Sequence, residues 1–342
     1  MPPRSIAALA EIGVGRGRLQ GKAWRKVAPG FYVPQGAGTV TETSSDGQVR
    51  RRISAQRILD AVPLLEGEAA LGTWAAAYIL GADWLDGRDP HTMAELPLDI
   101  MAPNLKRRST EAVTYHCSSL RATDTWTRDG IRITSPLRAT FDGARWAASL
   151  EEAVVFIDTM AAFALIRIPD LAAYATEHAG WSGVGQVVAA GQLARPGVKS
   201  GWETRLRLVW TRQVGLPTPM INVPIFNRAG DFLGEADLFD PDSGLVAEYD
   251  GGQHRAVSHH HNDNIREERF ESANLVVVRA DKVDLRDERE LLFHRLLDGY
   301  HRGQARDRGR DDWTLTPPAW WAHRFTRPSQ IPSQRRKIAA KT

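Results

Sequence analysis

Hydrophobic and polar positions form their clearest pattern in residues 198–300. Apolar side chains recur at helical spacing over 202–214, which predicts an amphipathic helix. Turn-forming clusters then separate runs of strand-like composition, which indicates an antiparallel meander of strands at 220–226, 232–239 and 245–249. We expect the segment to continue with a helix at 265–272, a β-branched strand at 274–280 and a helix at 288–300. The predicted order is α-β-β-β-α-β-α.

The pattern before residue 198 is mixed. A short apolar helix at 6–12, a basic stretch and a tight turn into a strand are followed by a linker-like run at 35–47 that is rich in Gly, Ser and Thr. Beyond it we expect helices at 55–65, 69–79, 149–163 and 169–178, and strands at 98–101, 113–116 and 131–134. Pro196-Gly197 is a domain boundary by its turn chemistry. The predicted domains are 1–50, 51–197, 198–300 and a basic, partly disordered tail, 301–342.

Composition places the chain among globular proteins. Its 342 residues, 42% hydrophobic and 25% charged, suit about two domains with real cores. The chain has no uncharged apolar run of 18 or more residues and no convincing signal peptide. Cys117 is the single cysteine, which excludes an internal disulfide and any zinc site with two cysteine ligands. We therefore expect a cytoplasmic protein with no membrane association.

Charge is unevenly divided along the chain. Residues 1–60 carry ten basic and four acidic side chains and residues 301–342 carry ten and three, whereas the middle carries 24 and 34. Basic ends around an acidic centre suit a protein that binds a polyanion and cations. Solvated surface with a basic tail explains the same numbers, and charge alone favours that explanation.

Three acidic residues occupy unusual places in the third segment. Glu248 and Asp250 end an apolar strand and point to one face, while Asp237 lies inside the preceding strand. Carboxylates in apolar strands are costly unless their charge is compensated, and converging oxygens suit Mg²⁺, with Mn²⁺ as a substitute. Asp237 joins Glu248 only if the strand register sets them on one face, since a slip of one residue separates them. The sequence leaves that register open.

This set of acidic residues, with the residues around them, resembles the motifs of the PD-(D/E)XK nuclease superfamily. More narrowly, it resembles the restriction-endonuclease-like branch related to very-short-patch-repair enzymes. The matching motifs, confined to about 198–298, are Glu203-Thr-Arg205-Leu-Arg207, Ala236-Asp237-Leu238, Glu248-Tyr-Asp250-Gly251-Gly-Gln253-His254 and Asp263-Asn-Ile-Arg266. The resemblance implies that Asp237 and Glu248 bind Mg²⁺ and that Glu203 completes or orients the site.

One position departs from the motif. Asp250 stands where the superfamily usually has Lys, and we expect it to bind metal or orient the attacking water. Gln253 or His254 would then handle the proton or position the water. Three other features have simpler interpretations. Glu203 and Arg207 also have the spacing of a helix-surface ion pair, and Arg266 could touch phosphate or only face solvent. The three histidines at 259–261 are best interpreted as a polar loop.

The first two segments more faintly resemble the AbiEi-type antitoxins, which combine a winged-helix-like head with a mixed domain. The matching residues are Trp24-Arg25-Lys26-Val27, Pro29-Gly30-Phe31-Tyr32-Val33-Pro34, Thr134-Ser135-Pro136 and Thr140-Phe141-Asp142. Arg25 and Lys26 become candidate phosphate contacts, although only about 20 residues precede Trp24 and the segment could be an ordinary strand pair.

The combined expectation is a mixed α/β chain with a winged-helix-like element, an α+β middle domain and a restriction-endonuclease-like C-terminal domain. We expect a Mg²⁺-dependent DNA endonuclease or nickase, acting in defence, mobile-element conflict or repair, and possible as a homodimer. Arg25, Lys26, Arg207 and Arg266 are the candidate DNA contacts. Two alternatives stay open: a non-catalytic DNA-binding regulator of the antitoxin type that retains a nuclease fold, and an RNA-cleaving nuclease.

Overall fold

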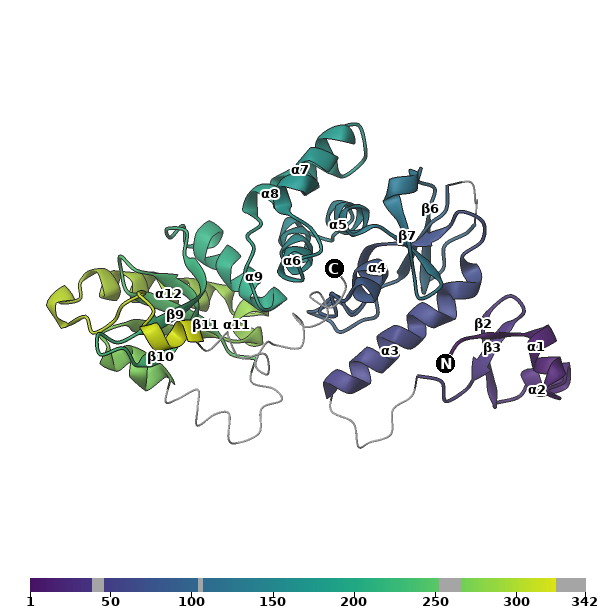
Figure 1. Cartoon of the computed structure of the whole chain (residues 1–342), viewed down its shortest axis with the longest axis horizontal. Helices are drawn as coiled ribbons and strands as arrows, with labels where there is room; N and C mark the ends of the chain where they lie inside the picture. Colours follow the sequence, from purple (N-terminus) through teal and green to yellow (C-terminus); the bar gives the residue numbers. More distant parts are fainter. Residues whose placement is uncertain (39–45, 104–106, 252–265, 324–342) are drawn as a thin grey trace. The chain divides into compact units, whose positions relative to one another are not determined.

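The computed structural model describes residues 1–38, 46–103, 107–251 and 266–323, without the side chains of 46–52 and 322–323. It is a mixed α/β protein, with 42% helix, 20% strand and three sheets. The chain forms two compact units, Met1–Pro196 and Gly197–Thr342, whose boundary falls at the Pro196-Gly197 dipeptide. Figure 1 follows the chain through both units by colour. None of the helices in the described ranges is long and apolar enough to cross a bilayer.

The first unit begins with a small β-α-α-β-β arrangement. Its elements are β1 (Arg4–Ser5), α1 (Ile6–Glu11), α2 (Arg16–Leu19), β2 (Trp24–Ala28) and β3 (Phe31–Pro34). The strands form one sheet in the order β1-β3-β2, with antiparallel pairs throughout. Leu9, Leu19 and Val33 are buried beneath the two short helices. Gly30, in the left-handed region at φ +76°, makes the tight turn between β2 and β3.

The rest of the first unit packs helices against a five-stranded sheet in the order β6-β5-β4-β8-β7. The strands are β4 (Ala70–Leu71), β5 (Leu98–Met101), β6 (Val113–His116), β7 (Thr125–Arg128) and β8 (Ile131–Thr134). The helices are α3 (Asp46–Ala61), η1 (Val62–Leu64), α4 (Thr73–Leu80), η2 (Ala122–Asp124), α5 (Pro136–Arg145), α6 (Leu150–Ala162), α7 (Ile168–Glu177) and α8 (Val184–Leu193). The helix predicted at 69–79 is wrong at its start, because Ala70 and Leu71 pair with β5 and β8 as a buried strand.

The second unit follows the expected order of elements. They are α9 (Gly201–Leu208), the π-helical turn η3 (Val209–Gln213), β9 (Met220–Phe226), β10 (Phe232–Asp240), β11 (Leu245–Tyr249), a helix at 266–272, β12 (Val276–Ala280), α11 (Lys282–Arg286) and α12 (Arg289–Gln304). The sheet order is β12-β11-β10-β9; β11 and β12 are parallel and the other pairs antiparallel. After α12 come η5 (Arg308–Arg310) and α13 (Ala319–His323), so part of the predicted tail is ordered helix.

Apolar side chains cover both faces of this sheet. On one face Leu238, Leu245 and Ala247 pack with Leu206 and Trp210 of the α9–η3 helix and with α12. On the other face Ala236, Phe239 and Val246 pack against Phe270 of the helix at 266–272. Each face of the sheet is therefore covered by a buried apolar layer of its own.

Candidate functional site

The register of β10 and β11 brings Asp237 and Glu248 together. Leu238 pairs with Ala247 and Phe239 with Val246, and just beyond this ladder the backbone amide of Tyr249 donates to Asp237 Oδ2 at 2.8 Å. Asp237 is thereby placed close enough to Glu248 to feel its negative charge. The turn fixes this register, because Asp240 Oδ2 accepts hydrogen bonds from the amide and hydroxyl of Ser243 at 3.0 and 2.6 Å.

Asp237 has a strongly perturbed acidity. Burial raises its pKa to about 7, with help from the negative charges of Glu203 and Glu248. The backbone N–H of Tyr249, 2.8 Å from Asp237 Oδ2, and the charge of Arg266 act in the opposite direction. Glu203 and Glu248 are themselves buried, with 6% and 2% of their surface exposed. Three carboxylates thus meet in a place with little water, where a cation would be favoured.

Glu203 is held in place from two sides. It lies in the first turn of α9, which is capped by the Ser200 hydroxyl accepting from the Glu203 amide at 3.2 Å. Glu203 Oε2 accepts hydrogen bonds from the Lys199 backbone amide and from Asn222 Nδ2, both at 2.8 Å. Its Oε1 accepts none from the residues that the structure describes, so one oxygen is anchored and the other is available to a ligand.

Arg266 comes from the helix at 266–272 and lies against the same group. Its Nη2 is 3.1 Å from Glu248 Oε2. Gly234 of β10 permits this approach: a Cβ there would lie 2.6 Å from Phe270 and 2.8 Å from the Arg266 side chain. Arg266 is therefore not a plain solvent-facing residue but the counter-ion of Glu248, and its contact with phosphate stays a prediction.

Asp250 follows β11 directly. Its backbone amide donates to the Ala280 carbonyl oxygen at 2.8 Å, which extends the pairing of β11 with β12. Its Oδ1 is buried and has no hydrogen-bond partner among the described residues. An orphaned carboxylate oxygen two residues after Glu248 suits a cation site better than a plain turn. Gln253, His254 and Asp263 lie outside the described residues.

The remaining basic candidates, Arg207, Arg25 and Lys26, differ in how far they are exposed and in what they contact. Arg207 is 3% exposed, so it does not form the helix-surface ion pair with Glu203 that the spacing also allowed. Its role as a DNA contact stays a prediction. Arg25 donates to Asp60 of α3 at 2.7 Å and ties β2 to that helix. Lys26 is exposed on β2, as are Arg16 and Arg18 on α2.

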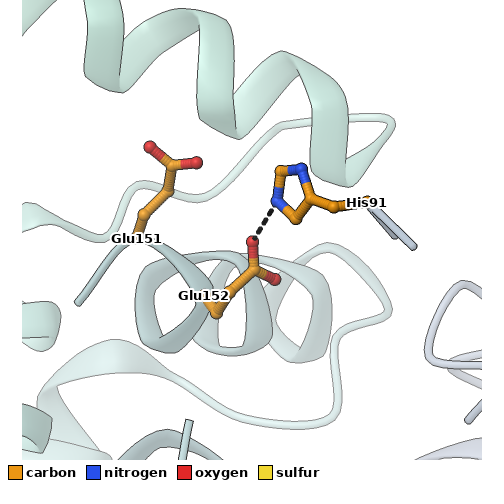
Figure 2. A group of neighbouring side chains, drawn as sticks. All are labelled: His91, Glu151 and Glu152. Carbon is orange, nitrogen blue, oxygen red and sulfur yellow. Dashed lines mark hydrogen bonds and ion pairs between the residues drawn. The ribbon is translucent and has the colours of Figure 1, made fainter. Parts of the chain in front are cut away.

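A second group of possible ligands lies in the first unit (Figure 2). His91, Glu151 and Glu152 bring three ligand atoms within 4.8 Å of one another, and in the described ranges this is the one group to do so. His91 Nε2 is 3.4 Å from Glu152 Oε1, and both glutamates lie in the first turn of α6, where the helix dipole favours negative charge. The ion pair and the dipole account for this group without a metal. The oxygens of Glu203, Asp237 and Glu248 are less closely gathered, and Glu248 Oε2 contacts Arg266 instead.

Sequence reasoning missed Asn222 and the backbone of Lys199. Asn222 lies between apolar residues of β9 and has φ +50°, a left-handed conformation that asparagine adopts more readily than most residues. A polar residue inside a strand-like apolar run is the signal that could have identified it. Lys199 acts through its main chain, and a main-chain contact leaves no mark in the sequence.

Comparison with known proteins gives no relative: no family model, no curated protein and no solved structure matches this chain.

Proposed function

We propose that this protein is a divalent-cation-dependent endonuclease or nickase that hydrolyses phosphodiester bonds in DNA. The observation that carries the proposal is the meeting of Glu203, Asp237 and Glu248, from three separate elements, around a carboxyl group whose pKa is raised to about 7. Perturbed acidity produced by burial and specific charge partners is typical of functional sites. Three buried carboxylates are costly unless their charge is compensated, and a cation would compensate it.

Asp237 and Glu248 would hold Mg²⁺ or Mn²⁺, with Glu203 and Asp250 completing the oxygen ligands. Such an ion lowers the pKa of a bound water and offsets charge on the scissile phosphate. Arg266 would be released from Glu248 by the ion's charge and left free to bind a phosphate oxygen. This supplies a positive group at a site whose motif position for Lys is taken by Asp250. The described residues of the second unit also follow the α-β-β-β-α-β-α order of the restriction-endonuclease-like fold that the motifs suggest.

DNA is favoured as the substrate by the first unit. Its β1-β3-β2 sheet and two short helices resemble a winged helix, in which α2 and the β2–β3 hairpin present the exposed Arg16, Arg18 and Lys26. Exposed cations of this kind contact phosphates and position a duplex without reading its sequence. The first unit would therefore bind the DNA that the second unit cuts.

A non-catalytic DNA-binding regulator is the second candidate, and Asp250 is the observation that favours it. A carboxylate cannot donate a hydrogen bond to the scissile phosphate as Lys does. The same three carboxylates could then bind a cation for stability alone. Cleavage, rather than binding, separates the two candidates.

The test uses the full chain with supercoiled plasmid, Mg²⁺ or Mn²⁺, and EDTA controls. We expect conversion to nicked or linear DNA by the wild type, none by Asp237→Asn or Glu248→Gln, and normal conversion by Asp298→Asn, a matched change to an exposed carboxylate on α12. Intact plasmid that all four proteins still bind would favour the regulator. Cleavage of a single-stranded RNA in place of plasmid would select the RNA nuclease, and cleavage by all variants would place the site elsewhere.

A further inference from the structure

Asn222 lies in one row with the acidic residues of the site. On β9, Ile221 pairs with Leu238 and Val223 with Ala236, so Asn222 lies across from Asp237, whose other neighbour in charge is Glu248 of β11. This row brings an amide, and no charge, next to Asp237, and the same amide contacts Glu203 of α9.

The amide makes two hydrogen bonds. Asn222 Nδ2 donates to Glu203 Oε2 at 2.8 Å and to the Gly197 carbonyl oxygen at 3.0 Å. Its φ of +50° turns the chain out of the regular strand conformation at this position. The unusual conformation and the two contacts occur together, which indicates that the backbone is shaped to aim this side chain.

We infer that Asn222 is a positioning residue: its amide fixes the carboxylate of Glu203 so that Glu203 Oε1 is presented as a ligand to the cation beside Asp237. The inference rests on the proposed function and adds to it a residue that touches neither metal nor substrate. Partners that orient a metal ligand typically change metal affinity by about 10- to 100-fold when they are removed. Without the amide, Glu203 gains rotamers and its Oε2 loses one of two donors.

The chain supplies a matched control in Asn274. It too has a left-handed conformation, φ +67°, and its Nδ2 donates to one carbonyl oxygen, of Asp307, and to one carboxylate oxygen, of Asp311. Asn274 is thus equivalent to Asn222 in geometry but lies away from the acidic group. Glycine tolerates positive φ, so Asn222→Gly and Asn274→Gly remove the amides without backbone strain.

The experiment measures Mn²⁺ binding to the full-length protein by electron paramagnetic resonance of free Mn²⁺, with thermal unfolding in EDTA to show that each variant is folded. We expect Asn222→Gly, and Asn222→Ser as a second variant that keeps a side chain, to weaken Mn²⁺ binding about tenfold or more. Asn274→Gly should leave the affinity within about twofold of wild type, as expected for a distant site. In a Glu203→Gln background, Asn222→Gly should cause no further loss, because its effect passes through Glu203.

The outcomes separate the two claims. A wild type that binds no Mn²⁺, or one whose binding Glu203→Gln leaves unchanged, would overturn the proposed cation site and this inference with it. Normal binding by Asn222→Gly and Asn222→Ser, when Glu203→Gln has lost it, would overturn the positioning role alone. An equal loss in the Asn274→Gly protein would show that Asn222 acts through general stability and would also overturn it.

Discussion

At the scale of single residues, the chemistry of the second unit depends on the proton of Asp237. Burial and the neighbouring Glu203 and Glu248 make its ionisation unfavourable, and the Tyr249 amide and Arg266 recover only part of the cost. A carboxyl group with a pKa of about 7 is half protonated at neutral pH. Cation binding must therefore displace a proton there, so affinity for Mn²⁺ should rise as the pH passes through 7.

The stability of the protein in EDTA should carry the signature of this group. The folded state holds the Asp237 proton with a pKa of about 7, against about 3.9 for an unfolded chain. The contribution of Asp237 to the free energy of unfolding is therefore fully present below about pH 4, falls as the pH rises to 7, and is constant above it. Asp237→Asn should lack that decline. The comparison is the melting temperature of the wild type and of Asp237→Asn from pH 4 to 8. Parallel dependence on pH in the two proteins would show that the pKa of Asp237 is ordinary.

A second residue-scale prediction concerns the buried ion pair of α5. Arg138 and Asp142 are fully buried, with Arg138 Nε 2.6 Å from Asp142 Oδ2 and Arg138 Nη1 3.4 Å from Asp124 Oδ2. Arg138→Ala removes one cation from each of two buried carboxylates, while Asp142 keeps Arg145 at 2.8 Å and Asp124 keeps Arg121 at 3.4 Å, and should cost about 1–3 kcal/mol of unfolding free energy. Urea denaturation measures this loss. A cost below about 1 kcal/mol, the size expected of a surface pair, would mean that the network relaxes or admits water.

At the scale of elements, close packing positions the site as much as its acidic residues do. The helix at 266–272 can deliver Arg266 to Glu248 only because β10 has no side chain at Gly234. The α9 helix delivers Glu203 from the opposite face of the sheet. The site is therefore assembled from two paired strands and two helices. The size of the side chains between each helix and the sheet sets how closely that helix can approach.

Gly234→Ala should separate this packing from the chemistry. The new methyl group would meet Phe270 at 2.6 Å, so the helix must shift, at a cost of about 1–3 kcal/mol. We expect lower thermal stability and weaker Mn²⁺ binding together. Gly191→Ala is the control: it lies inside α8 with no atom within 4 Å of the added carbon, and should stabilise by up to about 1 kcal/mol. A Gly234→Ala protein as stable as the wild type would refute the close contact.

The sequence predicts the elements of the second unit well because their patterns are local. The helical spacing over 202–214 and the turn clusters between strands need no knowledge of the rest of the chain. The pairing of Asp237 with Glu248 is different, since it depends on how Asp240 and Ser243 close their turn. In the first unit, Ala70 and Leu71 read as helix by composition but become strand because β5 and β8 lie on either side of them. Tertiary pairing there overrides propensity.

At the scale of the whole molecule, the chain is two units with separate cores. The first is built on the α4–α6 helices and the five-stranded sheet, and the second on the two faces of the β9–β12 sheet. The candidate cation site lies wholly within the second unit. A ligand that binds only the folded form stabilises the part that binds it.

Calorimetry of the full chain should therefore resolve the two cores. We expect two unfolding transitions, of which Mn²⁺ raises one and Arg138→Ala lowers the other. A ligand at 100 times its dissociation constant adds about 2.7 kcal/mol to the unfolding free energy of the unit that binds it. We expect this gain to raise the temperature of one transition by about 10 K or less and to leave the second transition unchanged. A single transition that responds to both changes would contradict independent cores.

The hydrogen bond from Asn222 to Gly197 has a consequence for anyone who builds chimaeras from this chain. Gly197 is the first residue of the second unit, and the amide that holds it also holds Glu203. Arg195, by contrast, is tied backward, its amide donating to Asp158 Oδ1 of α6 at 2.7 Å. A graft of the second unit onto a different N-terminal module should therefore be joined between Arg195 and Gly197, with Gly197 kept. Replacing Gly197 with a flexible spacer would loosen Glu203, a ligand of the proposed cation, while leaving every acidic residue in place.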